Sequence, residues 1–208
     1  MKLHSESITD GARIPDDFTF CKPAEEGRMC MSKNLNPHLA WEGVPDGTRS
    51  FALICHDPDV PSKADDVNQE GKVVPATLPR VDFFHWVLID LPAEMREIAA
   101  GSFSSEVTPG GKSGPEAPEG RQGVNDFTAF LAGDEEMKGD YYGYDGPCPP
   151  WNDEILHHYV FTIYALDVPR CPVAGRFGGQ EVREAIAGHV LAEASITGTY
   201  TLNPDVSG

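Results

Sequence analysis

Alternation of apolar residues with period two constrains this chain most, because a strand can follow that pattern and a helix cannot. The short apolar run Ser50–Cys55 predicts a buried strand, and Phe83–Leu91 predicts a longer one. His157–Leu166 alternates in the same way, and Ala194–Leu202, rich in Thr and Ile, predicts a last strand. Together these runs indicate an all-β fold.

Alternation also predicts which residues share a face. In Phe83–Leu91 both faces are apolar, so we expect a central strand that is covered on both sides. One face should carry Phe83, His85, Val87 and Ile89, and the other Phe84, Trp86 and Leu88. In the later strand His157 and Tyr159 should share a face, with His158 pointing the opposite way.

The remaining segments predict one helix and several loops. Apolar residues at helical spacing after a glycine pair predict an amphipathic helix over Gln180–Ala192, and Glu94–Ile98 is at most a short helix. Residues 62–79 and 108–123 are expected to be long loops, and the acidic stretch 133–140 a solvated excursion. No repeat or linker divides the chain, so we expect a single domain over residues 1–208.

Charge excludes some partners. The chain has 33 acidic and 16 basic residues, a formal net charge of -17, which repels nucleic acid and anionic lipid headgroups. Any bound anion must therefore be held by local donors. No apolar run is long enough to span a membrane, and the polar N-terminus has no secretory signal, so we expect a cytoplasmic protein.

Cysteine usage agrees with a reducing compartment. There are five cysteines, an odd number, and they form no C-x-x-C pair, so we expect small buried or incidental thiols. Cys148 differs because it lies inside a Pro-rich motif, where a nucleophilic thiolate would need a base such as His157. A small residue held there for fit is the favoured interpretation.

Several familiar motifs fail on inspection. Gly111-Lys112-Ser113 resembles the end of a phosphate-binding loop, but Glu106 stands where the first glycine is required. The segment also follows no apolar strand and opens no helix, so it is expected to be a loop. No zinc-ligand spacing occurs, and we expect neither a metal nor a cofactor.

A dispersed set of polar residues remains, each beside a turn or strand end: Asp57, Asp59, His85, His157 and Tyr159. Taken singly, each has an ordinary explanation, because Asp-Pro-Asp forms turns and a histidine on an apolar strand is usually a core residue. Taken together, they predict a preorganised pocket at one rim of an antiparallel sheet.

Ordered matches along the chain resemble the phosphatidylethanolamine-binding proteins, and specifically their bacterial Raf-kinase-inhibitor-like branch. The segments that carry the resemblance are Asn34–Trp41, Val44–Thr48, Asp57-Pro58-Asp59-Val60-Pro61, His85-Trp86-Val87, Asn125-Asp126-Phe127, Tyr144–Pro150, His157–Leu166 and Gly188–Ala194. The resemblance implies a β-sandwich of two antiparallel sheets with a few short helices. It also implies a rim pocket for phosphate, acetate or a phospholipid headgroup, and a homodimer.

Matching position by position, the resemblance implies that the pocket is lined by Asp57, Asp59, Pro61, His85, Gly146, Pro147, Pro150, His157 and Tyr159. Free backbone N–H groups around Gly146 are expected as phosphate donors. The sequence departs from the family in three places, of which His158 should point away from the pocket and leave it intact, while the two lengthened spans bear on ligand size and access. His158 stands where the family usually has Arg, the acidic span 151–156 is about one residue longer than usual, and 128–142 is extended.

Three classes of function are compatible with these residues. We favour a non-enzymatic module that binds a phosphate-bearing small molecule or a phospholipid headgroup, with Asp57 holding an imidazolium or meeting a headgroup ammonium. Protonated histidine would be the nearby cation, so affinity should fall as pH rises through about 6.5. The alternatives are an inhibitor of a kinase or protease partner, and an acid–base hydrolase using Asp57 with His85 or His157.

Overall fold

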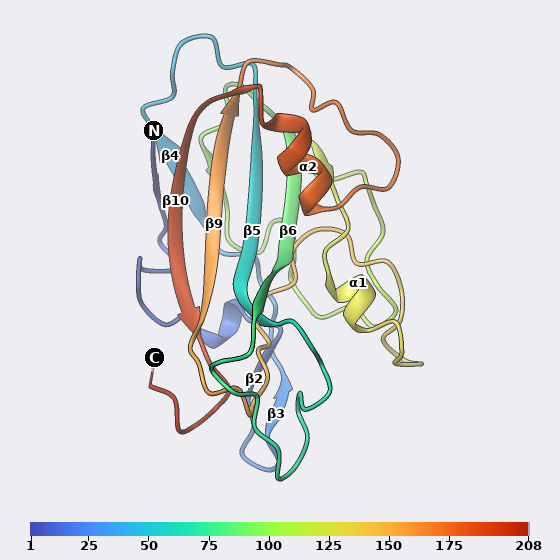
Figure 1. Cartoon of the computed structure of the whole chain (residues 1–208). Coiled ribbons are helices and arrows are strands. Elements are labelled where there is room, and N and C mark those ends of the chain that lie inside the picture. Colours follow the sequence, from blue (N-terminus) through green and yellow to red (C-terminus); the bar gives the residue numbers. More distant parts are fainter. Residues whose placement is uncertain (208) are drawn as a thin grey trace.

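The computed structural model describes residues 1–207 and is organised around one antiparallel five-stranded sheet (Figure 1). Its strands lie in the order β10-β9-β5-β6-β8. Their bounds are Val190–Tyr200, His157–Leu166, Ser50–Pro61, Arg80–Pro92 and Arg121–Gln122 respectively. The strand β9 has the bounds that the sequence predicts, and β5 and β6 extend beyond the predicted runs.

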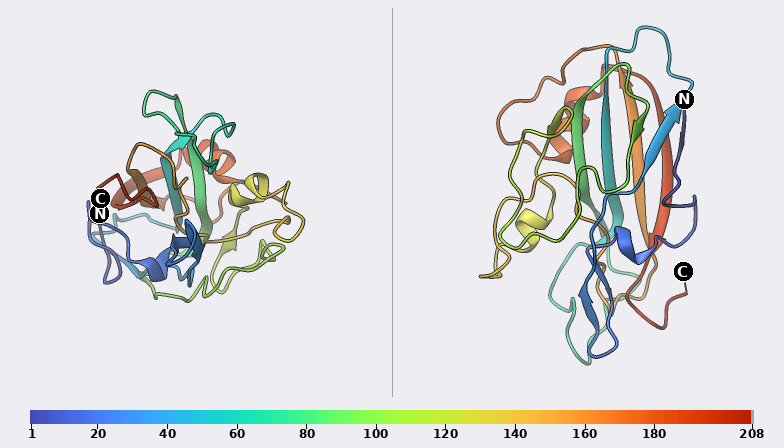
Figure 2. Two further views of the ribbon diagram at one scale, coloured as in Figure 1. Left: turned by 90° about the horizontal axis from the view of Figure 1, so that it is seen from below. Right: turned by 180° about the vertical axis from the view of Figure 1, so that it is seen from behind.

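A smaller sheet covers one face of the large one, as the rear view in Figure 2 shows. It contains β1 (Lys2–His4), β4 (Leu39–Glu42) and β7 (Glu97–Ile98), all antiparallel. A separate pair, β2 (Cys21–Pro23) and β3 (Met29–Met31), lies at one end of the molecule. The expected all-β fold of antiparallel sheets is confirmed.

The central sheet has a hydrophobic core on each face, as the two-sided pattern of β6 predicts. On one face Phe51 and Leu53 pack in a cluster with Trp41 of the small sheet. On the other face Ala52 and Ile54 pack in a cluster that includes the helical residues Val182 and Ile186. Each fully buried aliphatic side chain stabilises the fold by roughly 1.5–3 kcal/mol.

Short helices complete the fold: a 3-10 turn (Asp16–Phe18), α1 (Phe127–Phe130) and α2 (Gly179–Ile186). The prediction that the second helix runs to Ala192 is wrong. Its helical spacing continues to Val190, but Val190 pairs with Leu166 as the first residue of β10. None of these helices, in the part of the chain described, is long or apolar enough to cross a membrane.

Other expectations also need correction. The segment Glu94–Ile98 is a turn followed by the strand β7, because Ile98 is buried and pairs with Leu39. The Asp57-Pro58-Asp59 motif was expected to form a turn at the end of the strand that begins at Ser50, and this is wrong. The motif lies within β5, where pairing with β6 slips between Asp57 and Val60.

A β-bulge at His85 changes the face assignment within β6. Cys55 pairs with Trp86 while the next residue, His56, pairs with Phe84, so one extra residue of β6 is accommodated there. The bulge resets the alternation. Phe84 therefore joins the Val87 cluster, and Phe83 packs against the opposite core, which reverses the predicted faces of these two phenylalanines.

Candidate functional site

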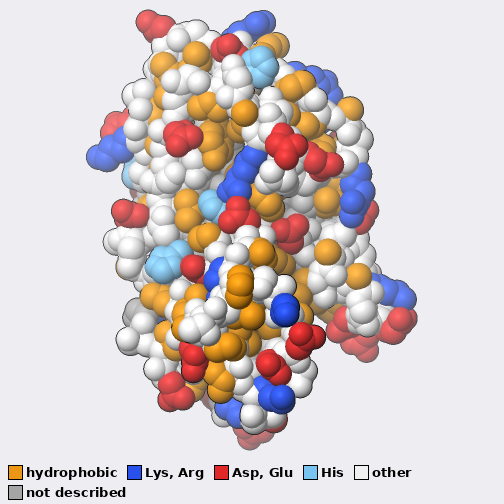
Figure 3. All heavy atoms as spheres, viewed as in Figure 1, with side chains coloured by type: hydrophobic (Ala, Val, Ile, Leu, Met, Phe, Trp, Pro, Cys, Tyr) orange, Lys and Arg blue, Asp and Glu red, His pale blue; other side chains and the backbone are white. Residues whose placement is uncertain are grey.

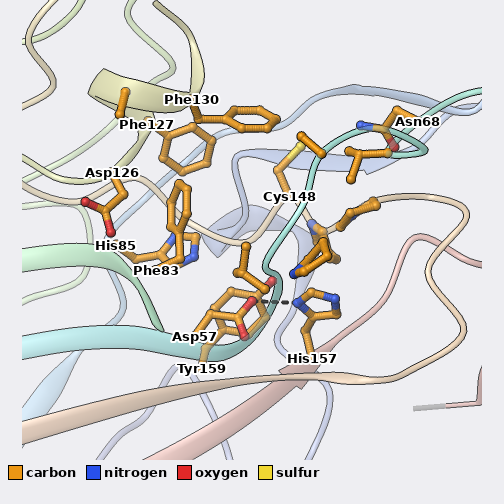
Figure 4. A pocket seen from close by; sticks show the side chains of 17 residues that line it. Asp57, Asn68, Phe83, His85, Asp126, Phe127, Phe130, Cys148, His157 and Tyr159 are labelled. Atoms are coloured by element: carbon orange, nitrogen blue, oxygen red, sulfur yellow. Dashed lines mark hydrogen bonds and ion pairs between the residues drawn. The ribbon is translucent and has the colours of Figure 1, made fainter. Parts of the chain in front are cut away.

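A cavity of about 360 Å³ opens where β5, β6 and β9 meet α1 and the loops after β5 and before β9 (Figure 4). Most of its lining is apolar, and three phenylalanines form one wall. The lining residues are Asp57, Val60, Pro61, Ala64, Val67, Asn68, Phe83, His85, Asp126, Phe127, Ala129, Phe130, Cys148, Pro149, Pro150, His157 and Tyr159.

Six of the nine predicted site residues line this cavity together: Asp57, Pro61, His85, Pro150, His157 and Tyr159. Asp59 does not, because its carboxylate accepts hydrogen bonds from the backbone N–H of His158 at 3.0 Å and from the His158 ring at 2.8 Å. The exposed His158 points away from the cavity, as alternation predicts. Ligand binding by the six lining residues stays a prediction.

Gly146 and Pro147 also lie outside the lining. The Gly146 N–H donates to the side-chain oxygen of Asn34 at 2.8 Å, so it is not the free donor that was expected. Glycine is needed at this position because a Cβ would lie 2.3 Å from the Phe18 carbonyl oxygen. The carbonyl of Pro147 accepts from the N–H groups of Phe20 and Cys21. Both residues hold the pocket wall in place without facing the cavity.

His157 is clamped between two carboxylates. Its Nδ1 donates to Asp57 at 2.7 Å and its Nε2 to Asp153 at 3.2 Å. Arg80 in turn binds Asp153 through two hydrogen bonds, of 2.5 and 3.0 Å. Burial alone would lower the pKa of His157, but the bonds to Asp153 and Asp57 outweigh it and raise the pKa to about 9. The imidazolium therefore has no N–H left for a ligand.

His85 is neutral at pH 7. Its Nδ1 lies 2.7 Å from the carbonyl oxygen of Asp145, and a carbonyl only accepts, so Nδ1 carries the proton. Burial lowers the pKa of His85 to about 4. Its Nε2 makes no hydrogen bond within residues 1–207 and is left as an acceptor at the cavity wall. Of the two pocket histidines, His157 therefore carries the positive charge and His85 does not.

The remaining polar groups are mainly acceptors. Burial raises the pKa of Tyr159 well above its usual value and the charge of Asp57 adds to the rise, so the hydroxyl keeps its proton. The Asp126 carboxylate accepts from the Phe84 N–H at 2.7 Å, and burial raises the pKa of Asp126. Asn68 accepts from Trp151 through its oxygen, which leaves its amide nitrogen as a donor at the cavity wall.

Sequence reasoning missed the aromatic wall. Phe83 of β6 meets Phe127 edge-on with ring centroids 5.3 Å apart, and Phe130 lies 6.3 Å from both rings. Phe127 lies in the segment Asn125-Asp126-Phe127, which the sequence analysis had matched to the family, and Phe130 follows at helical spacing. These two features were the available signal. Phe130 is 53% exposed. Apolar side chains also gather at the lower centre of the face that Figure 3 shows.

Cys148 is joined by a disulfide to Cys21, with the two Cα atoms 4.8 Å apart. The expectation of five free thiols is therefore wrong, and the cysteine argument for a reducing compartment fails with it. The two residues are 127 positions apart, and sequence alone cannot show which distant cysteines meet. Because Cys148 lines the cavity in its oxidised form, it has no thiolate with which to act as a nucleophile.

Asn152 holds the loop 62–79 against the cavity. Its side-chain nitrogen donates to the carbonyls of Asp66 and Lys72 at 2.8 and 3.1 Å, and its oxygen accepts from the Asn68 N–H at 2.9 Å. These bonds place Val67 and Asn68 in the cavity wall. Asn152, in the span 151–156, thus organises this wall of the cavity.

Comparisons with known proteins agree with the fold. The family model described as phosphatidylethanolamine-binding protein matches residues 4–201. The UPF0098 protein YbhB of Escherichia coli is 32% identical over 97% of this chain and 100% of its own length. An Aquifex aeolicus UPF0098 protein is 30% identical, over 96% of this chain and 88% of its own length.

Solved structures show the same similarity. The crystal structure of Escherichia coli YbcL, described as a new member of the mammalian PEBP family, matches with a TM-score of 0.68 and 26% identity, covering 96% of this chain and 97% of that one. CT736 of Chlamydia trachomatis, a PEBP homologue, matches with a TM-score of 0.63 and 25% identity, covering 96% and 95%. The chain belongs to the phosphatidylethanolamine-binding protein family.

Proposed function

We propose that this protein binds a small amphiphile whose headgroup donates hydrogen bonds, of the ethanolamine-phosphate type. One observation supports this most: the polar groups of the cavity are mostly acceptors, and they lie beside an aromatic wall. Asp57, Asp126 and the free Nε2 of His85 can receive N–H groups, and the phenylalanine faces attract a cation. A headgroup ammonium meets both requirements, and the apolar walls suit the first carbons of a chain.

A bare anion fits this cavity less well at neutral pH. To donate to an anion through Nε2 while Nδ1 keeps its bond to the Asp145 carbonyl, His85 must be protonated, and with a pKa of about 4 this costs about 4 kcal/mol at pH 7. One charge-assisted hydrogen bond returns only about 1.5–3 kcal/mol. Anion affinity should therefore rise as pH falls towards about 4, which replaces the expectation of a transition near 6.5.

The phosphate of such a headgroup would face outward. The amide nitrogen of Asn68 is the donor that the loop 62–79 contributes to the cavity wall. With the ammonium towards Asp57 and the phosphate towards Asn68, each charged end of the ligand meets a group of suitable polarity. This orientation assigns Asn152 an indirect part in binding, because it holds Asn68 in position.

Calorimetry with soluble short-chain lipids tests the proposal. Dihexanoyl-phosphatidylethanolamine should bind at least about tenfold more tightly than dihexanoyl-phosphatidic acid at neutral pH, a difference of about 1.4 kcal/mol. Phe130→Ala should weaken that binding by about 1 kcal/mol through lost apolar contact. The matched control is Val73→Ala, which alters an exposed side chain outside this cavity and should leave affinity unchanged. Tighter binding of phosphatidic acid, or equal loss in both variants, would contradict the proposal.

The hydrolase alternative is weaker on this geometry. His157 is held between two carboxylates with a pKa of about 9, and His85, with a pKa of about 4, is a poor general base at neutral pH. Product release from a headgroup ester with a bell-shaped pH profile would favour this alternative, whereas saturation without product supports a binding module. Inhibition of a kinase or protease, a cytoplasmic location and a homodimer stay expectations from the family resemblance.

A further inference from the structure

Lys112 lies in the Gly- and Pro-rich loop 108–123, yet its ammonium group is buried behind the pocket wall. Its side chain is 15% exposed. The Nζ atom donates to the carbonyl oxygen of Tyr144 and, at 2.9 Å, to the carboxylate of Asp145. An ammonium is costly to bury without partners. Although residues 111–113 form no phosphate-binding loop, Lys112 is held by specific buried acceptors.

Asp145 is the buried partner, and its side chain has no exposed surface. Besides Lys112, its carboxylate accepts from the amide nitrogens of Asn34 and Asn125, both at 2.7 Å. Burial raises the pKa of Asp145 while Lys112 and the two amides oppose that rise. Removing one member of a buried ion pair leaves the other charge uncompensated, which is strongly unfavourable. The position of Asp145 thus depends on Lys112.

The main chain of Asp145 holds His85. Its N–H donates to the His85 carbonyl oxygen at 3.0 Å, and its own carbonyl accepts from Nδ1 of the His85 ring at 2.7 Å. The second bond fixes which nitrogen carries the proton. One residue therefore connects the buried ammonium to the ring that faces the cavity.

We propose that Lys112 is a positioning residue: through Asp145 it fixes the His85 ring with the proton on Nδ1 and with Nε2 as an acceptor towards the ligand. The part of this proposal that concerns the ligand rests on the proposed function. The part that concerns the His85 ring does not, because the protonation of each ring nitrogen is measurable in the free protein.

Histidine-labelled protein and ring ¹⁵N NMR test the proposal. The wild type should show neutral His85 with the proton on Nδ1 across the neutral pH range. Lys112→Met should give a mixture of the two tautomers and a higher His85 titration midpoint, because Asp145 loses its compensating cation. The matched control, Lys138→Met, removes an exposed lysine paired with Glu135 and should leave both readouts unchanged.

A double variant separates positioning from general destabilisation. Combining Lys112→Met with Asp145→Asn leaves no uncompensated buried charge, and the oxygen of the new amide can still accept from one of the two asparagine side chains that Asp145 binds. We expect this double variant to recover the wild-type tautomer. If Lys112→Met does not fold, Lys112→Gln replaces it, because its amide can still donate to the Tyr144 carbonyl while the positive charge is removed. A wild-type tautomer in folded Lys112→Gln would overturn the proposal. Unchanged His85 signals in folded Lys112→Met, or mixed tautomers in the double variant, would overturn the proposal.

Affinity for dihexanoyl-phosphatidylethanolamine, measured on the same proteins, separates the two proposals. Lys112→Met should bind at least about tenfold more weakly than wild type, which is about 1.4 kcal/mol. An altered His85 tautomer with unchanged affinity would uphold the positioning of the ring and refute the proposed role of His85 in binding.

Discussion

The two pocket histidines have opposite pKa shifts, and stability should depend on pH accordingly. His157 has a folded pKa of about 9 against 6.5 for an unperturbed histidine. Because the folded state holds this proton more tightly, its contribution is fully present below pH 6.5 and is lost as pH rises through 9. A difference of 2.5 units corresponds to about 3 kcal/mol.

His85 acts in the other direction. Its folded pKa is about 4, so between pH 6.5 and pH 4 the unfolded chain binds a proton that the folded protein does not. The stability of the folded state therefore falls as pH drops through this window, again by about 3 kcal/mol. The two effects together predict a maximum of stability near pH 6.5, with a loss on each side.

Urea unfolding between about pH 4 and about pH 10 measures both limbs. His157→Gln should reduce the loss of unfolding free energy above pH 6.5 relative to wild type. His85→Gln should reduce the loss below pH 6.5. His189→Gln, which changes an exposed histidine paired with Asp167, is the control and should leave both limbs unchanged. A wild-type free energy of unfolding that changes by less than about 1 kcal/mol between neutral pH and pH 10 would refute the reasoning for His157.

Three further outcomes are expected. Replacing Cys21 and Cys148 with Ser should lower the free energy of unfolding, measured in urea, by up to about 5 kcal/mol, because their disulfide closes a long loop. Cys30→Ser is the control. A loss below about 1 kcal/mol in the double variant would contradict a stabilising role of the disulfide. Asn152→Ala should speed amide hydrogen exchange in residues 62–79 but not in the central sheet; equal exchange in both proteins would show that Asn152 does not hold the loop. Light scattering at micromolar concentration should show a homodimer, and a species of 22.6 kDa would refute it.

The sequence predicts the strands well where alternation is regular. His157–Leu166 has the predicted bounds, and His157 and Tyr159 line the same cavity because residues two apart in a strand share a face. The Gln180–Ala192 helix is overextended because Val190 fits helical spacing and strand pairing equally well. Pairing with Leu166 decides between them, and that contact is long-range.

The features that the sequence does not predict depend on tertiary contacts. The β-bulge in which His85 is the extra residue cannot be predicted from a run of apolar residues. It nevertheless determines which side of the sheet Phe83 and Phe84 occupy. The Cys21–Cys148 disulfide likewise depends on the distance between two remote segments. The charge of each histidine follows from its surroundings, since two carboxylates keep His157 protonated, whereas burial keeps His85 neutral although the Asp145 carbonyl opposes this by raising the pKa.

The charge of the whole chain and the chemistry of the cavity lead to the same constraint on the ligand. A protein of net charge -17 has no general attraction for an anion, so local donors would have to hold one. The folded chain uses its expected donors internally: Gly146 donates to Asn34, and both nitrogens of His157 donate to carboxylates. What faces the cavity is mostly acceptors and aromatic rings. Under the proposed function the ligand brings its own donors, as an ammonium headgroup does.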